Sequence, residues 1–178
     1  MNRPPLAGFQ PTADKLLYSA NWDAFDKVPF WDALDAIGIV AYFPLSRRPS
    51  PSESELAQGW QLWKEKLASV AAREKRPIIF VEANYADNVY GAAEPYAYWR
   101  TDPKDRDLQE RCLRLLLRLE GERWLAGIFL WEWHPDQPRS GNDPLNLNQP
   151  RLQELLRASG LVKDSQIQPR GKVLNRKS

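Results

Sequence analysis

Two segments of the sequence end in residues that could carry chemistry. The run PIIFVE places Glu82 at the end of an apolar, strand-like segment, and IFLWEWHPD closes a second such segment with Trp131 and Trp133. A carboxylate at the end of an apolar strand must be solvated, paired or at work in a reaction. Aromatic rings can stack on the C–H face of a sugar ring. From the residues alone, Glu82 could be a catalytic group or part of an ion pair. The two tryptophans could stack on a sugar or fill the core.

Strand alternation predicts which of these side chains share a face. Successive side chains of a strand point to opposite faces, so Glu82 is expected on the same face as Ile78 and Phe80. By the same spacing, the two tryptophans share a face and Glu132 between them points away.

Metal and nucleophile-triad chemistry find little support in the sequence. His134 is the only histidine, and no Cys/His spacing typical of a zinc site accompanies it. The run His134-Pro135-Asp136 is more typical of a loop cap, and neither a G-x-S-x-G motif nor a phosphate-binding glycine loop is present. We therefore expect no metal and no cofactor.

Four strand-like runs must position these residues. Because they alternate with helical or loop-plus-helix sequence, they predict an α/β fold with a parallel sheet. The connections after the strand ends are long and rich in Pro, Gly, Asn and Asp, as is typical of loops that build active sites. The predicted strands are Lys15–Asn21, Ile37–Phe43, Pro77–Glu82 and Trp124–Trp133.

The predicted helices differ in the strength of their signals. Ser52 and Glu55 form a capping box ahead of apolar residues spaced by three and four, which predicts a long helix. A second helix is expected over about residues 104–120, with Cys112 on its apolar stripe, and a short one follows Pro150. The first connection holds only a brief helix, around Trp31–Leu34.

Composition limits the class of protein. With 178 residues, 43% apolar and 27% charged, the chain is expected to form one soluble domain. Its 25 basic and 23 acidic residues nearly balance, and its tryptophans lie beside carboxylates and prolines, so nucleic acid is not an expected partner. Without an apolar h-region or a run of about 18 apolar residues, neither a signal peptide nor a membrane span is expected, which predicts a cytoplasmic chain.

The chain divides into three predicted regions. Residues 1–14 form an N-terminal extension, residues 15–160 form the domain, and residues 161–178 form a mobile basic tail in which the apolar pattern fades.

Three segments carry a resemblance to a known family: LLYSANWDAFDKVPFWDALDAIGIVAYFPLS, RPIIFVEANY and GIFLWEWHPD. In this order they resemble the C-terminal half of glycoside hydrolase family 113, whose members are (β/α)8-barrel enzymes acting on β-mannan-type polysaccharides. The resemblance implies a TIM-barrel-type fold of which the chain holds about half, with four βα units and strands five to eight. It also implies a retaining glycosidase with an oligo- or polysaccharide as its partner.

The resemblance implies roles for individual residues. Glu82, ending strand seven, corresponds to the nucleophile, and Tyr42, ending strand six, lies beside it. Four further residues at the ends of strands five and eight would line the sugar site: Asn21, Trp22, Trp131 and Trp133.

Two departures from the family pattern bear on activity. Val40 stands where the family usually has an Asp, and no counterpart of the acid/base Glu of strand four is present. A retaining glycosidase needs two carboxyl groups about 5 to 5.5 Å apart. Alternation points Glu132 away from the tryptophans, and no spacing places Asp87 or Glu94 correctly.

Three interpretations therefore stay open. The chain is a glycoside hydrolase-like protein that lacks its acid/base, a non-catalytic carbohydrate-binding remnant, or a truncated fragment. Because four strands leave two edges unpaired, we expect either a marginally stable monomer or association with another copy or a separately encoded N-terminal half.

Overall fold

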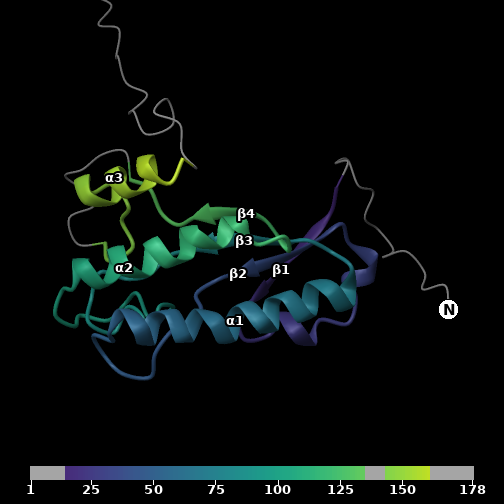
Figure 1. Ribbon diagram of the computed structural model, residues 1–178, viewed down its shortest axis with the longest axis horizontal. Helices are drawn as coiled ribbons and strands as arrows, with labels where there is room; N and C mark the ends of the chain where they lie inside the picture. Colours follow the sequence, from purple (N-terminus) through teal and green to yellow (C-terminus); the bar gives the residue numbers. More distant parts are fainter. Residues whose placement is uncertain (1–14, 135–142, 161–178) are drawn as a thin grey trace, which may run out of the picture.

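A computed structural model gives the structure of residues 15–134 and 143–160. A parallel sheet of four strands, in the order β1-β2-β3-β4, forms its centre (Figure 1). The predicted extension, 1–14, and the predicted tail, 161–178, lie outside the described residues. The strands are β1 (Leu17–Asn21), β2 (Ala36–Val40), β3 (Ile78–Ala83) and β4 (Leu125–Leu130), and the α-helices are α1 (Glu53–Glu74), α2 (Arg106–Leu117) and α3 (Pro150–Ala158).

The two long helices cover one face of the sheet. Figure 1 shows α1 and α2 running along the strands, with α3 next to α2. We call this side the helix-covered face and the opposite side the open face. Strands in sequence order with helices between them are the arrangement of a (β/α)8 barrel, of which four units are present here.

The helix-covered face holds the main core. Its strand residues are fully buried, and they meet apolar side chains from the buried stripes of both helices. This packing excludes water from the centre of the sheet, which is the main source of stability for the domain. The residues concerned are Ile37, Ile39, Ile78 and Phe80 from the sheet, Leu56, Trp60, Leu67 and Val70 from α1, and Leu108, Cys112, Leu113 and Leu116 from α2.

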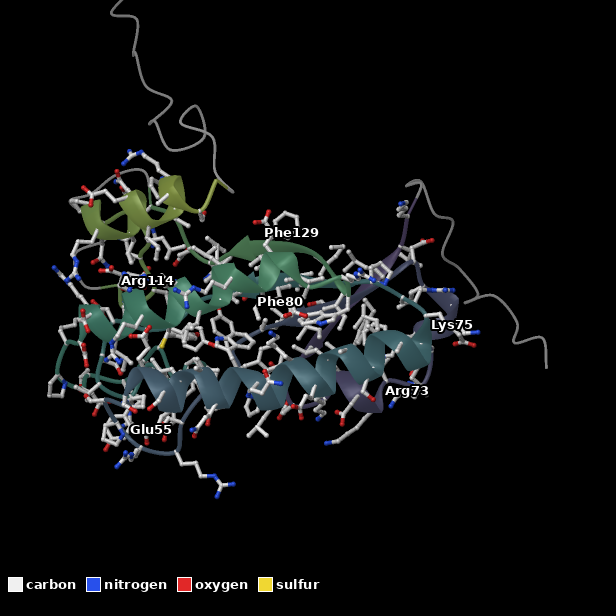
Figure 2. All side chains as sticks on the ribbon, in the orientation of Figure 1. Glu55, Arg73, Lys75, Phe80, Arg114 and Phe129 are labelled. Atoms are coloured by element: carbon white, nitrogen blue, oxygen red, sulfur yellow. The ribbon has the colours of Figure 1, made fainter. Side chains whose placement is uncertain are left out.

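Helix α1 begins where the capping box predicted. The Glu55 N–H donates to the Ser52 hydroxyl at 3.3 Å, and the Ser52 N–H donates to the Glu55 carboxylate at 2.9 Å. The helix ends at the left-handed residue Lys75, with φ of 55° (labelled in Figure 2). Gly59 lets α1 lie directly on the chain after β2, because a Cβ there would meet the Leu45 carbonyl at 2.2 Å. The sequence signals for this helix are confirmed.

The connection between β1 and β2 contains two short 3₁₀ turns, Phe25–Lys27 and Trp31–Ala33. Trp31 is buried and its indole N–H donates to the Phe25 carbonyl at 2.8 Å. The brief helix predicted around Trp31 is therefore present as a 3₁₀ turn, and the connection between β1 and β2 contains no α-helix.

Strand β4 is shorter than predicted. It ends at Leu130, and the chain beyond it pairs with a later segment: the Glu132 N–H donates to the Leu145 carbonyl at 3.3 Å and the Leu147 N–H donates to the Glu132 carbonyl at 3.0 Å. The strand prediction reached Trp133 because the apolar pattern continues there, whereas the backbone partners change.

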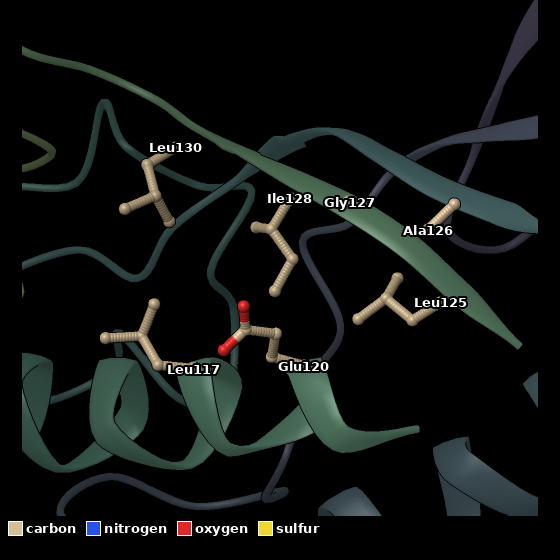
Figure 3. A pocket seen from close by; sticks show the side chains of 7 residues that line it. All are labelled: Leu117, Glu120, Leu125, Ala126, Gly127, Ile128 and Leu130. Atoms are coloured by element: carbon tan, nitrogen blue, oxygen red, sulfur yellow. The ribbon is translucent and has the colours of Figure 1, made fainter. Parts of the chain in front are cut away.

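The outer edge of β4 borders a small apolar pocket of about 190 Å³. Figure 3 shows Leu125, Ile128 and Leu130 of β4 pointing toward Leu117 of α2 and Glu120 of the following 3₁₀ turn, Arg118–Gly121. Within the described residues, no strand pairs with this edge. No helix of the described part is long and apolar enough to cross a membrane.

Candidate active site

A β-bulge turns Glu82 onto the open face. Ile39 pairs with Phe80, but the next residue, Val40, pairs with Glu82, so Val81 is an extra residue in β3. Paired residues of neighbouring strands share a face, and a bulge changes the side to which later residues point. The prediction that Glu82 shares a face with Phe80 is therefore wrong. Phe80 is buried under the helices, and Glu82 lies on the open face beside Val40.

Tyr42 is a polar partner of Glu82. It follows Val40 in the chain and lies 3.4 Å from the Glu82 carboxylate through its hydroxyl, which donates a long, weak hydrogen bond. Burial, followed by the negative charge of Glu82, raises the pKa of the Tyr42 hydroxyl well above its usual value of 10. The hydroxyl therefore stays protonated at neutral pH and remains a donor toward the carboxylate.

Asn21 and Trp22 lie at the end of β1, on the same edge of the sheet. Asn21 pairs with Val40 in register and its side-chain amide donates to Asp23 at 2.9 Å. Trp22 packs against the small apolar cluster that contains Tyr42. Both residues predicted at the end of strand five are therefore near the Tyr42–Glu82 pair.

The two tryptophans after β4 occupy different environments. Trp131 is 45% exposed, whereas Trp133 is half-buried and packs against the main core. Trp131 lies next to β3, because its backbone N–H donates to the Ala83 carbonyl at 3.2 Å. Since β4 has ended at Leu130, strand alternation does not govern these two side chains.

Asn84 joins the end of β3 to the segment that follows β4. It is fully buried, its amide donates to the Leu145 carbonyl at 2.5 Å and to the Trp131 carbonyl, and its oxygen accepts from the Tyr85 N–H. This residue was not among the predicted site residues. The asparagine directly after the strand-end glutamate was visible in the sequence, but its partners are 47 and 61 residues away.

A carboxylate, a tyrosine hydroxyl and tryptophans thus meet at the carboxyl edge of a parallel sheet. The family model that matches the sequence is Glycoside Hydrolase Family 113, over residues 13–146. The chain belongs to glycoside hydrolase family 113. No curated protein sequence matches it.

Solved family 113 structures share the fold. A structure described as a complex of GH113 beta-1,4-mannanase superposes with a TM-score of 0.67 at 19% identity, covering 84% of this chain and 46% of its own. The GH113 beta-mannanase AaManA from Alicyclobacillus acidocaldarius, in complex with ManMIm, superposes with a TM-score of 0.65 at 23% identity and the same coverage. This family 113 chain therefore spans about half the length of these structures, and the predicted partial TIM-barrel fold is confirmed.

Three further acids of this family 113 chain lie near the site, and each has a cationic partner. Asp87 is buried and accepts from the Lys104 ammonium at 2.6 Å, and Glu94 pairs with Arg100 at 2.7 Å. The charge of Glu132 contributes to the raised pKa of the Tyr42 hydroxyl. The Glu132 side chain lies 3.2 Å from the His134 imidazole.

His134 lies between two carboxylates. Its Nε2 atom is 2.6 Å from Asp143 and 3.2 Å from Glu132, and the three ligand-type atoms lie within 4.8 Å of one another. The hydrogen bond to Asp143 and the charge of Glu132 raise the pKa of His134. These distances suit a protonated imidazole shared by two acceptors, and a divalent cation is the other species that such a donor set could hold. Pro135 and Asp136 of the predicted loop cap lie outside the described residues.

Proposed function

We propose that this chain is the nucleophile-bearing part of a retaining glycosidase that acts on β-linked, mannan-type polysaccharide. The observation that carries the proposal is the position of Glu82, which the β3 bulge turns onto the open face within 3.4 Å of the Tyr42 hydroxyl. Membership of family 113 and the resemblance to beta-mannanase structures support the polysaccharide as substrate.

In the proposed reaction, a Glu82 oxygen attacks the anomeric carbon and forms a glycosyl ester as the bond to the leaving oxygen breaks. An acid must protonate that leaving oxygen, and water then hydrolyses the ester. The Tyr42 hydroxyl orients the Glu82 carboxylate before attack. Because a retained proton keeps Tyr42 neutral, it adds no negative charge beside the nucleophile.

The three other acids described at this site do not supply the second carboxyl group of a retaining glycosidase. Glu132 is near but faces His134, and Asp87 and Glu94 are held by Lys104 and Arg100. We infer that four further βα units complete both the sheet and the acid/base pair. The unpaired β4 edge and its apolar pocket support this inference.

An activated substrate tests the nucleophile in this chain alone. With dinitrophenyl β-mannoside the leaving group departs as a phenolate and needs no proton donor. We expect one equivalent of phenolate to be released and the protein to gain the mass of one glycosyl residue on Glu82. Glu82→Gln removes both signals, while Glu132→Gln retains them as the matched control.

The outcome of peptide mapping decides the assignment. A glycosyl group on any carboxylate other than Glu82, or phenolate release that survives Glu82→Gln, contradicts the proposal. With β-mannan itself, turnover is expected only after mixing with the strand-one-to-four half of a related enzyme, which supplies the acid.

A second candidate function is carbohydrate binding without turnover. One observation favours it: Val40, which pairs in register with Glu82, puts an apolar side chain where the family usually has an Asp. Binding of manno-oligosaccharides with no phenolate release from the activated substrate would support this function over hydrolysis.

A further inference from the structure

Three aromatic side chains are exposed on the loop that follows Glu82. Tyr96, Tyr98 and Trp99 are 38%, 56% and 67% exposed, and they lie between β3 and α2. Single exposed aromatic residues are common on protein surfaces, but a group of them beside a site marks a place of interaction. None of the three was among the residues predicted to bind substrate.

The loop that carries these rings is held by specific contacts. Arg100 pairs with Glu94 at 2.7 Å and with Asp102, and its guanidinium lies 4.1 Å from the centre of the Tyr90 ring. Backbone hydrogen bonds from Ala97 to Glu94 and from Arg100 to Ala97 form the turns between them. The rings are therefore presented by a fixed backbone, which lowers the entropic cost of binding a ligand.

The base of the loop is also fixed to the domain. The Leu45 N–H donates to the Ala92 carbonyl at 2.8 Å, and the Val89 N–H donates to the Pro103 carbonyl at 3.0 Å. Gly91 allows the tight path, because a Cβ there would meet the Ala86 carbonyl at 2.1 Å.

The exposed rings are connected to the Tyr42–Glu82 pair through contacts between aromatic side chains. Tyr96 stacks on Trp22 with ring centres 5.5 Å apart and planes 13° apart, and Trp22 packs against the cluster of Tyr42. Tyr98 is close enough to Tyr42 to contribute to its raised pKa, and its ring lies 5.4 Å from that of Trp99. Aromatic surface therefore extends from the neighbour of Glu82 to the outside of the loop.

We propose that Tyr96, Tyr98 and Trp99 form an aromatic platform that binds pyranose units of a β-linked glycan next to the unit held at Glu82. Ring faces stack on the C–H faces of sugars, and the surrounding charged groups of Glu94, Arg100 and Asp102 can bond to hydroxyl groups. This mixture suits a polyhydroxylated chain better than the contiguous apolar core of a protein interface. The inference rests on the proposed function and extends it to longer substrates.

Binding of oligosaccharides of two lengths tests the platform. The full chain and its variants Trp99→Ala and Tyr98→Ala are titrated by calorimetry with β-1,4-mannobiose and β-1,4-mannohexaose. Loss of one stacking ring is expected to weaken hexaose binding about three- to tenfold and to leave biose binding unchanged. Phe129→Ala is the matched control, because Phe129 is an aromatic residue that is 66% exposed on β4, outside this loop.

Each outcome has one meaning. If the wild-type chain binds hexaose and both variants bind it as tightly, the platform is refuted while the proposed function stands. If the wild-type chain binds neither sugar, the platform and the proposed function for this chain are both refuted. Equal weakening of biose and hexaose binding also refutes the platform, because it indicates a change at the Glu82 unit.

Discussion

Two phenylalanines on neighbouring strands show how the two faces of the sheet differ. Phe80 of β3 is 0% exposed and lies between the sheet and the helices, whereas Phe129 of β4 is 66% exposed on the open face (Figure 2). On the helix-covered face, α1 and α2 of this chain complete the core. The open face holds the candidate catalytic residue but little packing. One side of the sheet therefore contributes most of the stability, and the other side holds the candidate catalytic residue.

The largest expected effect tests this contrast directly. Phe80→Ala should lower the free energy of unfolding by about 3 to 5 kcal/mol, because it leaves a cavity in the core. Phe129→Ala should change it by less than about 0.5 kcal/mol. Urea denaturation followed by tryptophan fluorescence measures both. A large cost for Phe129→Ala would mean that the open face is covered in solution, as association predicts.

A smaller effect is expected at the boundary between the faces. Asn84→Leu leaves the carbonyls of Leu145 and Trp131 without their buried donor, which should cost about 1 to 3 kcal/mol. Asn21→Leu, at an exposed asparagine on the same edge, is the control and should cost little. If the two variants unfold alike, the segment after β4 is not held by Asn84.

Helix α1 can be destabilised at its first turn by a substitution outside the core. Ser52→Ala removes the hydroxyl that accepts from Glu55 at the start of α1 and should cost about 1 kcal/mol. Ser69→Ala, on the exposed side of the same helix, should be neutral. Hydrogen exchange would show the loss confined to the first turn of α1, and uniform loss across the sheet would contradict this.

The smallest expected effect on stability is the one at His134. The pKa of His134 is raised above 6.5 in the folded chain, so its stabilising effect is fully present below pH 6.5 and is lost as pH rises through the folded value. Because the side chain is 35% exposed, solvent screening limits this to about 0.5 kcal/mol. The stability difference between wild type and His134→Gln should shrink from pH 6 to pH 9. A constant difference would show that His134 does not titrate in this range.

Local signals predicted much of the fold. Ser52 and Glu55 marked the start of α1 because a capping box depends only on residues three positions apart. The four apolar runs predicted the four strands because buried parallel strands need such composition. The ends of the strands were less accurate: after Leu130 the apolar pattern continues, and only the distant segment at Leu145 and Leu147 shows that the pairing has changed.

The site was predicted in part. The resemblance placed Glu82, Tyr42 and Trp22 on one edge, and the structure brings them together. The face of Glu82 could not be predicted, because the bulge depends on the register between β2 and β3. The exposure of Tyr98 and Trp99 could not be predicted either, since sequence pattern alone does not distinguish an exposed aromatic residue from a buried one.

The extra residue in β3 separates two roles of one strand. Phe80, before Val81, packs into the core, and Glu82, after it, faces the open side. Deleting Val81 would return the carboxylate to the helix-covered side, where burial of an unpaired charge is costly. A shortening of the chain by one residue would therefore remove the candidate nucleophile and weaken the core together.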